Sequence, residues 1–198
     1  MRHIFFVFLT ICVSCRPINF SEKPNIILIV ADDLGYGDLS IFGNEYISTP
    51  NIDKLGHEGI ILKDFHSNGS VCSPTRAALL TGKYQQKVGV PGVITAKNHR
   101  DKGLSLGEKT FAEIAKEVGY KTGVFGKWHL GYDPKFNPTN FGFDQFYGYV
   151  SGNIDFHTHR DGAGYHDWYH NKKKVIENGY STDLITKHSA NFINQNKK

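Results

Sequence analysis

Residues 25–30 read Asn25-Ile26-Ile27-Leu28-Ile29-Val30, and Ala31-Asp32-Asp33 follow directly. The run is continuously apolar after its first residue, and most of its side chains branch at Cβ. This composition predicts a β-strand buried on both faces, as in the central parallel sheet of an α/β protein. Ligands bind such sheets beyond the carboxyl ends of the strands. Asp32 and Asp33 are therefore expected at a ligand-binding edge.

A helix and a second strand are predicted further along the chain. Thr110 and Glu113 have the spacing of a capping box at the start of an amphipathic pattern. A strand over residues 121–125 is expected next, and Lys127 and His129 follow its carboxyl end. Because parallel strands end at the same edge of a sheet, these two side chains are expected near the acidic pair.

The remainder of the chain gives two further expectations. Residues 133–179 are rich in Gly, Asn, Asp, His and aromatic residues with little periodicity, which predicts long surface loops. A last helix is expected over residues 182–194, capped by Ser181 or Thr182. No internal repeat or interdomain linker interrupts this pattern.

The sequence Cys72-Ser73-Pro74-Thr75-Arg76 predicts the start of another helix. Ser73 is a suitable cap, Pro74 suits the first turn, and Gly82 suits the left-handed position after the last turn. Residues four apart share a helix face, so Arg76 is expected beside Cys72 at a positive helix N-terminus. Such a pocket favours sulfate, phosphate or carboxylate, although an ordinary buried cysteine at a helix start is the alternative.

These motifs resemble those of the sulfatases, arylsulfatase-like and formylglycine-dependent enzymes within the alkaline phosphatase superfamily. The resemblance runs from about residue 23 to the end of the chain. It implies an α/β fold with an alkaline-phosphatase-like central, mostly parallel sheet flanked by helices, incomplete here, with residues 23–198 as the N-terminal part of the catalytic domain. The ordered motifs that carry it are residues 30–38, 49–55, 72–76 and 126–131.

The resemblance also implies a chemistry for each site residue. Cys72 would be converted to Cα-formylglycine by a maturation enzyme, and the aldehyde hydrate would attack the sulfur of a sulfate ester. Asp32, Asp33 and the modified Cys72 would bind Ca²⁺, with Mg²⁺ as the alternative. The catalytic residues would be Cys72, Arg76, Lys127 and His129. Lys127 would bind a sulfate oxygen, and His129 would transfer a proton with a pKa near the working pH.

Loop residues are expected to contact the substrate, which would be a sulfated small molecule or a sulfated polysaccharide. Ser151 lies close to a position where some sulfatases place a sulfate-contacting residue. The loop histidines, His159 among them, are expected to face the substrate. His166 and His170 have a spacing that would suit zinc on a helix, but the segment lacks cysteine partners.

Composition and the N-terminus bear on location. Residues 1–15 combine a positive start with an apolar run too short to span a membrane, which predicts a signal peptide and export. The end of this run resembles a lipobox, so lipid attachment at Cys15 and free secretion are both open, and the location would be periplasmic, outer-membrane or extracellular. The net charge of +4 includes no dense basic stripe, so no nucleic-acid partner is expected.

The chain departs from the family in its length. Sulfatases are usually much longer, and the further metal ligands, histidine and lysine of their later half have no match here. A truncated, inactive fragment of a sulfuric ester hydrolase is therefore expected. The alternatives are a phosphate or phosphonate ester hydrolase of the same superfamily and an inactive relative that binds sulfated carbohydrate.

Overall fold

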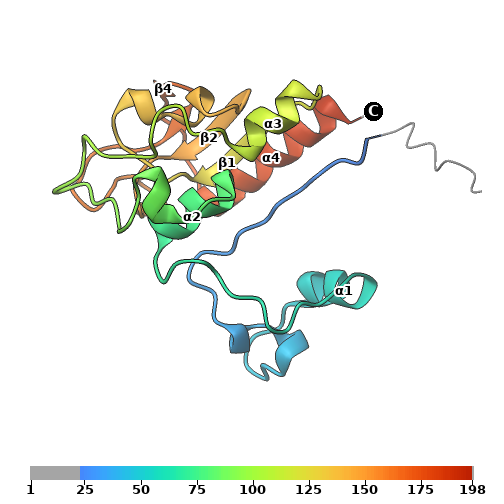
Figure 1. Cartoon of the computed structure of the whole chain (residues 1–198). Coiled ribbons are helices and arrows are strands. Elements are labelled where there is room, and N and C mark those ends of the chain that lie inside the picture. The colour runs from blue at the N-terminus through green and yellow to red at the C-terminus, as the bar shows by residue number, and fades with distance from the viewer. Residues whose placement is uncertain (1–22, 198) are drawn as a thin grey trace, which may run out of the picture. The chain divides into compact units, whose positions relative to one another are not determined.

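The computed structural model describes residues 23–197. The chain divides into two units, residues 1–30 and 31–198, which are described separately. The described part of the second unit contains α-helices, β-strands and short 3-10 helices (Figure 1). The helices are α1 (Pro50–Glu58), α2 (Cys72–Thr81), α3 (Phe111–Glu117) and α4 (Ser181–Asn196), and the strands are β1 (Gly123–Lys127), β2 (Gln145–Tyr149), β3 (Tyr169–His170) and β4 (Lys173–Lys174). The 3-10 helices are Tyr36–Asp38, Ser40–Phe42, Gln85–Val88, Pro134–Phe136 and Pro138–Asn140.

Residues 23–30 form no strand, so the prediction of a buried central strand at this position is wrong for this structure. The side chains are exposed, with Ile26 at 71% and Ile29 at 79%. A buried strand needs hydrogen-bonding neighbours and apolar cover on both faces. Within residues 23–197 no strand pairs with this segment, so its apolar composition alone does not produce a sheet.

The predicted signal peptide at residues 1–15, with Cys15, lies outside the described residues. In the part of the chain that the structure covers, no helix combines the length and the apolar character needed to cross a membrane.

The sheet has the order β1-β2-β3-β4. β1 and β2 are parallel, with Lys127 opposite Tyr149 at their carboxyl ends, whereas β2–β3 and β3–β4 are antiparallel. The α/β class is thus confirmed, but the sheet is partly rather than mostly parallel. Three of its strands lie within the segment that was predicted to be loops.

A tight hairpin explains the antiparallel half of the sheet. His170 pairs with Lys173, and the turn between them places Asn171 at a φ of 54°. Asparagine tolerates this left-handed conformation better than most residues. The Asn171 side chain accepts a hydrogen bond from the Phe146 backbone at 2.9 Å, and the Asn171 amide donates to the Phe146 carbonyl at 2.7 Å. The turn residue therefore joins the hairpin to β2.

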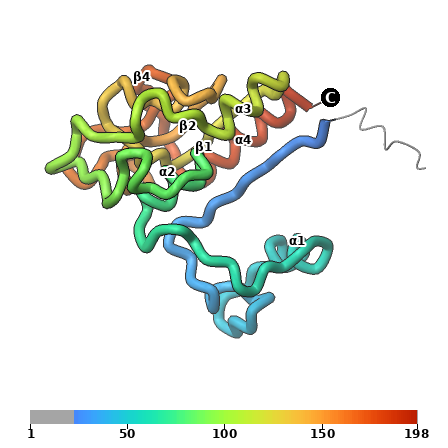
Figure 2. The backbone as a smooth tube through the Cα atoms, viewed as in Figure 1, coloured from blue at the N-terminus to red at the C-terminus, as the bar shows by residue number. Residues whose placement is uncertain are grey.

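Helix α4 runs antiparallel to β1. Ideal Cβ positions at Gly123 and Gly126 would lie 3.2 Å from Phe192 and 3.4 Å from Ile185, respectively, so the glycines let the helix approach the strand closely. The N-terminus of α4 consequently lies at the edge of the sheet where β1 ends. Figure 2 follows this path of the backbone from β1 through β2 to α4.

Two clusters of buried apolar residues stabilise the second unit. The larger one surrounds Trp128, whose Nε1 donates to the Phe136 carbonyl at 2.8 Å, and the smaller one lies under α4. Fully burying such a side chain contributes on the order of 1.5–3 kcal/mol. The larger cluster includes Trp128 and Leu130, the residues on either side of His129. It consists of Ala77, Leu80, Val88, Val90, Ile94, Leu104, Ala112, Trp128, Leu130, Phe136, Phe141, Phe143, Phe146 and Val150.

The structure contains two of the predicted helix caps and replaces a third. The capping box at Thr110 and Glu113 is present, and α3 begins directly after it. Gly82 ends α2 at a φ of 65°, as predicted. The N-cap of α2 is Val71 rather than Ser73, because the Ser73 hydroxyl is buried and accepts a hydrogen bond from the Ile94 amide at 3.2 Å.

Glu177 connects α4 to the sheet. Its carboxylate accepts hydrogen bonds from residues of three different segments, which are Tyr147 Oη at 3.0 Å, Trp168 Nε1 at 3.3 Å, Lys187 Nζ at 3.0 Å and His188 Nε2 at 2.9 Å. Burial raises the pKa of Glu177, but these hydrogen bonds outweigh it and lower the pKa to about 2. The ionised form is therefore strongly favoured in the folded protein.

A lowered carboxylate pKa predicts a loss of stability in acid. The contribution of Glu177 is complete above the unfolded pKa of 4.5 and is lost as the pH falls through about 2. We expect Glu177→Gln to lower the free energy of unfolding by about 3 kcal/mol at pH 7 and by much less at pH 2. Urea unfolding at both pH values measures this difference.

Glu108→Gln is the matched control for this prediction. Glu108 is as exposed as Glu177, at 19%, but within residues 23–197 its one cationic partner is Lys83. Its removal is expected to cost under about 1 kcal/mol. Equal losses in the two variants would contradict the role assigned to Glu177.

Candidate active site

Asp32, Arg76 and Lys127 meet although they are far apart in the sequence. The Lys127 Nζ lies 2.8 Å from Asp32 Oδ2, and the Arg76 Nη2 lies 3.2 Å from Asp32 Oδ1. Lys127 is the last residue of β1, and Arg76 lies in the second turn of α2. The expected meeting of these segments beyond the carboxyl end of β1 is thus seen in the structure.

The two cations are fixed more firmly than the carboxylate. The Lys127 side chain is 5% exposed and that of Arg76 is 16% exposed, against 43% for Asp32. A second guanidinium nitrogen, Arg76 Nη1, donates to the Lys127 carbonyl at 2.7 Å. Burial raises the pKa of Asp32, but Lys127 and Arg76 outweigh it and leave the pKa below 3.8. The site therefore holds two positive charges around one ionised carboxylate.

Asp32, Asp33 and Cys72 form a possible cation-binding group. One ligand atom from each residue lies within 4.8 Å of the others. Asp33 has a φ of 54°, and Cys72 is the first residue of α2 and is partly exposed. Carboxylate oxygens suit a hard cation such as Ca²⁺ or Mg²⁺, whereas a cysteine sulfur suits softer metals. The donor set fits a hard cation once the sulfur is replaced by oxygen.

His129 lies in the interior at the same edge of the sheet. It is 4% exposed, its φ is 57°, and its Nε2 donates to the Ile94 carbonyl at 2.8 Å. Its Nδ1 is buried and has no hydrogen-bond partner in the described part of the chain. Burial and the nearby Lys127 and Arg76 lower the pKa of His129 to about 4, although the bond to Ile94 opposes this. The expectation of a pKa near the working pH is therefore wrong, and the ring is neutral at pH 7.

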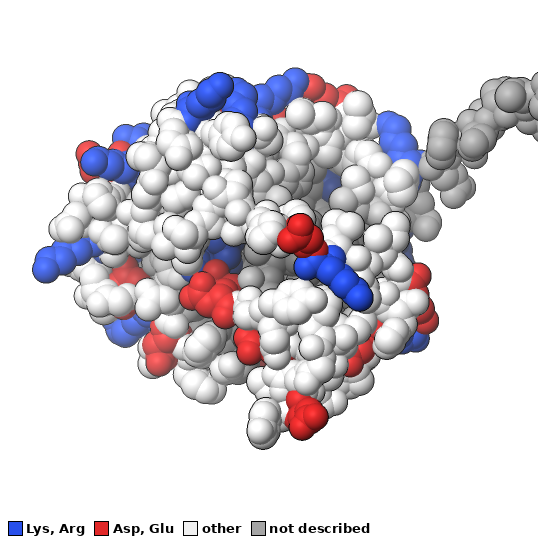
Figure 3. Space-filling view, turned by 60° about the horizontal axis from the view of Figure 1, so that its bottom comes forward, with Lys and Arg blue, Asp and Glu red and all other residues white. Residues whose placement is uncertain are grey.

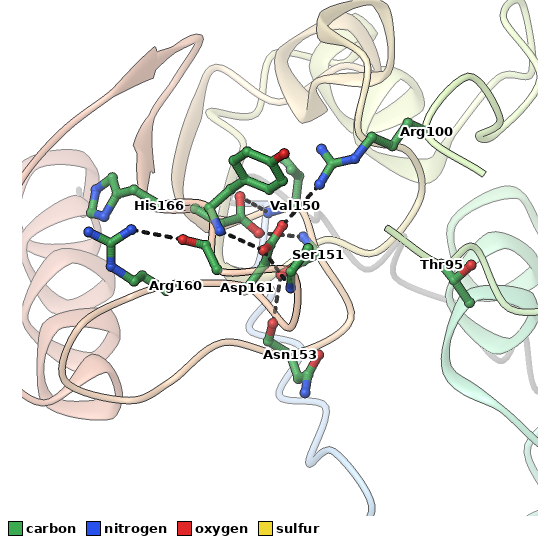
Figure 4. Close-up of polar contacts among 12 residues, drawn as sticks. Thr95, Arg100, Val150, Ser151, Asn153, Arg160, Asp161 and His166 are labelled. Carbon is green, nitrogen blue, oxygen red and sulfur yellow. Dashed lines mark hydrogen bonds and ion pairs between the residues drawn. The ribbon is translucent and has the colours of Figure 1, made fainter. Parts of the chain in front are cut away.

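Ser151 follows β2 and packs into the interior. It is 1% exposed, its hydroxyl donates to the Asn153 carbonyl at 2.8 Å, and its amide donates to Asp167 Oδ2 at 2.8 Å. Figure 4 shows these bonds around Ser151 and Asn153. The contacts assign Ser151 a structural role, and sulfate binding by its side chain stays a prediction.

His159 is also in the interior. It is 1% exposed, its Nε2 donates to the Gly179 carbonyl at 3.2 Å, and its ring stacks on Trp168 at a centroid distance of 4.6 Å. This contradicts the expectation of a substrate-facing loop histidine. His166 and His170 do not share a helix, because His166 forms an isolated β-bridge and His170 lies in β3. The His166 Nε2 donates to the Val175 carbonyl at 2.8 Å.

Tyr149 joins the site without having been predicted from the sequence. It lies opposite Lys127 in the parallel pair, and paired residues of neighbouring strands point to the same face of a sheet. Burial, with the charges of Asp32 and Cys72, raises the pKa of Tyr149 to about 12, so its hydroxyl stays protonated. The three aromatic residues within 145–149 were the available signal for this strand.

Fold and site together define an α/β protein in which a lysine, an arginine and a carboxylate meet at the carboxyl end of a parallel strand pair. The sulfatase family model matches residues 24–198. The chain therefore belongs to the sulfatase family, as its motifs predicted.

Curated relatives agree with this assignment. Arylsulfatase A of Homo sapiens is 48% identical over 131 residues, which are 65% of this chain and 25% of the relative. Arylsulfatase H of Canis lupus familiaris is 43% identical over 143 residues, which are 67% of this chain and 25% of the relative. The chain thus spans about a quarter of the length of the curated relatives that it matches.

Solved structures show the same fold. The crystal structure of Ps i-CgsB matches with a TM-score of 0.81 and 34% identity, covering 88% of this chain and 42% of that one. BT4656, solved in complex with its substrate D-glucosamine-2-N,6-O-disulfate, matches with a TM-score of 0.69 and 29% identity, covering 87% of this chain and 31% of that one.

Proposed function

We propose that residues 23–198 form the N-terminal part of a sulfatase catalytic domain in a protein that hydrolyses sulfate esters. The observation that carries the proposal is the cluster of Lys127, Arg76 and Asp32, with a carboxylate oxygen of Asp32 within 4.8 Å of Cys72 Sγ. Two fixed cations beside a nucleophile position match a tetrahedral oxyanion better than a neutral substrate.

The cations would bind the sulfate group. The Arg76 guanidinium presents planar N–H donors, and the Lys127 ammonium is a compact point charge. Both are largely shielded from water, so their attraction for an anion is weakened less than on an open surface. Sulfate oxygens would lie between them, in competition with Asp32.

Asp32, Asp33 and residue 72 would hold a divalent cation, which we propose is Ca²⁺, with Mg²⁺ as the alternative. When bound, the cation draws charge from sulfate oxygens, and Cα-formylglycine at residue 72 supplies an oxygen nucleophile where cysteine would offer sulfur. Ca²⁺ takes about six to eight oxygen ligands, and the described residues group three candidates. We therefore expect weak cation binding and no sustained sulfate release by this chain alone.

Nδ1 of His129 would be the proton acceptor close to the reacting group. The bond from Nε2 to the Ile94 carbonyl fixes the tautomer, so Nδ1 carries the free lone pair. Its neutral state at pH 7 makes Nδ1 ready to accept a proton without prior deprotonation. A pKa of about 4 keeps the ring neutral at pH 7 but makes Nδ1 a weaker base than the role predicted from the sequence assumed.

The substrate class, the maturation partner and the location follow from the same proposal. The relatives solved with sulfated sugar and with k-i-k-neocarrahexaose support a sulfated saccharide as the substrate class. A formylglycine-generating enzyme would be the maturation partner. The predicted signal at residues 1–15 supports export, with lipid attachment at Cys15 or free secretion as the two outcomes.

The conversion of Cys72 tests the proposal directly. The chain is produced with and without a formylglycine-generating enzyme, and the peptide containing residue 72 is examined by mass spectrometry. We expect conversion of Cys72 only in the presence of the enzyme, because Cys72, Pro74 and Arg76 supply the recognition residues that the family resemblance implies. Pro74→Ala is the matched variant, and it should reduce conversion while leaving α2 folded.

Anion binding completes the test. Calorimetric titration of the converted chain should show tighter binding of inorganic sulfate than of inorganic phosphate. Preference for phosphate would favour a phosphate ester hydrolase, and unconverted Cys72 with retained binding of a sulfated glycan would favour an inactive carbohydrate-binding relative. Sustained sulfate release from 4-nitrocatechol sulfate by the isolated chain would contradict the incomplete ligand set.

A further inference from the structure

Arg100 is held in a fixed position by aromatic rings and by a buried acid. Its guanidinium carbon lies 5.2 Å from the Tyr132 ring centroid and 4.9 Å from that of Tyr165. Its Nη2 forms an ion pair with Asp161 Oδ2 at 3.4 Å (Figure 4). Stacking and ion pairing restrict a side chain that is otherwise among the most flexible.

The acid that holds Arg100 is fixed by the backbone. Asp161 is 3% exposed at its side chain, and its Oδ1 accepts hydrogen bonds from the amides of Ala163 and Tyr165, both at 2.9 Å. The Asp161 carboxylate is thus stabilised without Arg100, and the 3.4 Å ion pair is long. Asp161 therefore fixes the orientation of the Arg100 guanidinium but takes up few of its N–H donors.

Arg100 keeps donors for another ligand. A guanidinium has five N–H donors. Within residues 23–197 the Arg100 side chain donates one hydrogen bond, the one to Asp161, and the side chain is 47% exposed. A half-exposed guanidinium with a fixed plane is pre-organised for two parallel bonds to sulfate or carboxylate.

Contacts connect Arg100 to the candidate active site. Tyr132, which stacks on Arg100, follows His129 by three residues, and the Gly152 backbone lies close to it: burial raises the pKa of Tyr132, and this backbone opposes the rise. Gly152 packs on the His129 imidazole so closely that a Cβ there would lie 2.6 Å from its Cε1. Tyr132 and Gly152 therefore connect Arg100 to His129, which follows Lys127 by two residues.

One face of the molecule carries no band of positive charge. Figure 3 shows Lys and Arg interspersed with Asp and Glu over the face it draws, without a continuous basic band. A polyanion attracted by overall charge would have no preferred position on such a face. Recognition of an anion would depend on individual, oriented cations such as Arg100.

We propose that Arg100 forms a second anion subsite, which binds a further sulfate or carboxylate group of the substrate held at Lys127. This proposal rests on the proposed function, because it assumes that a sulfated saccharide occupies the site. It assigns to Arg100 the selection of substrates with two anionic groups over substrates with one. Tyr132 and Tyr165 would keep the guanidinium plane facing the substrate.

Calorimetric titration of the full chain tests the subsite by binding, without turnover. The probes are D-glucosamine 6-sulfate, D-glucosamine-2-N,6-O-disulfate and a monosulfated disaccharide that carries a uronate carboxylate. We expect the disulfate or the uronate compound to bind about tenfold more tightly than the monosulfate. Arg100→Gln should abolish this preference while leaving the affinity for the monosulfate unchanged.

Two further variants serve as controls. Arg160→Gln removes the same charge from an arginine whose Nη1 donates to the Gly164 carbonyl, and it should keep the tenfold preference. Arg100→Lys keeps the charge next to Asp161 and should retain only about a threefold preference, because an ammonium cannot form two parallel bonds. The thermal unfolding midpoint of each variant shows whether folding has changed.

The outcomes separate this proposal from the proposed function. A preference that survives Arg100→Gln, or a wild-type chain with no preference for either doubly anionic probe, overturns the subsite. Preference for the disulfate identifies sulfate as the second group, and preference for the uronate compound identifies carboxylate. Failure of the proposed function would show instead as unchanged monosulfate affinity in Lys127→Met, whatever Arg100→Gln does.

Discussion

Lys127→Met is expected to weaken the binding of inorganic sulfate to the chain about 100-fold. The Lys127 ammonium is 5% exposed and lies 2.8 Å from Asp32, so it is shielded from water in a way that surface lysines are not. Removing it leaves the Asp32 carboxylate facing the anion with only Arg76 to offset the charge. Methionine has a similar length and volume, so the packing at the end of β1 should be retained.

Calorimetric titration with sodium sulfate measures the affinity, and urea unfolding shows whether the variant is folded. Lys109→Met is the matched control, because Lys109 pairs with Glu117 on the surface and is 53% exposed. That control should change sulfate affinity less than about twofold. A Lys127→Met chain that binds sulfate as tightly as the wild type would show that the anion is held elsewhere.

Signals that depend on neighbouring residues in the chain predicted the structure well. The capping box at Thr110 and the left-handed Gly82 are local features, because each needs only a few residues to determine the backbone. The position of Lys127 followed from one topological rule, that a side chain after a parallel strand lies at its carboxyl edge. Its ion pair with Asp32 is the consequence that the structure adds.

Signals that depend on distant partners were less informative. Residues 25–30 have the composition of a buried strand, yet a strand forms only where another strand offers hydrogen bonds and side chains cover it. β3 and β4 have two residues each, and their pairing depends on Asn171 joining the hairpin to Phe146. No periodicity can show in strands of that length, which is why the segment was predicted to be loops.

Histidine roles show the same limit. The sequence identifies His129 and His159 as candidate site residues, but whether their side chains are exposed depends on residues far away in the sequence. Ile94 and Gly152 enclose His129, and Trp168 and Gly179 enclose His159. Burial lowers the pKa of His129 from the near-neutral value that its sequence motif predicts to about 4, and the ring is a neutral acceptor at pH 7.

Gly148→Ala is expected to cause the largest loss of stability, at least about 3 kcal/mol, because it separates the two strands that form the site. Gly148 lies opposite Gly126 in the parallel pair and has a φ of 152°. A Cβ at Gly148 would lie 2.1 Å from the Gly126 carbonyl oxygen, which is backbone and cannot move aside as a side chain can.

The displacement would reach the candidate active site, because the next pair in the register is Lys127 and Tyr149. Gly164→Ala is the matched control: Gly164 also has a positive φ, 86°, but its Cβ would meet nothing within 4 Å. Backbone strain alone should cost that variant about 1–2 kcal/mol. Urea unfolding at pH 7 and sulfate titration compare the two. Because the clash acts on the strand pair itself, Gly148→Ala should lose sulfate binding together with stability, and equal stability losses in both variants would show that the strands can separate without cost.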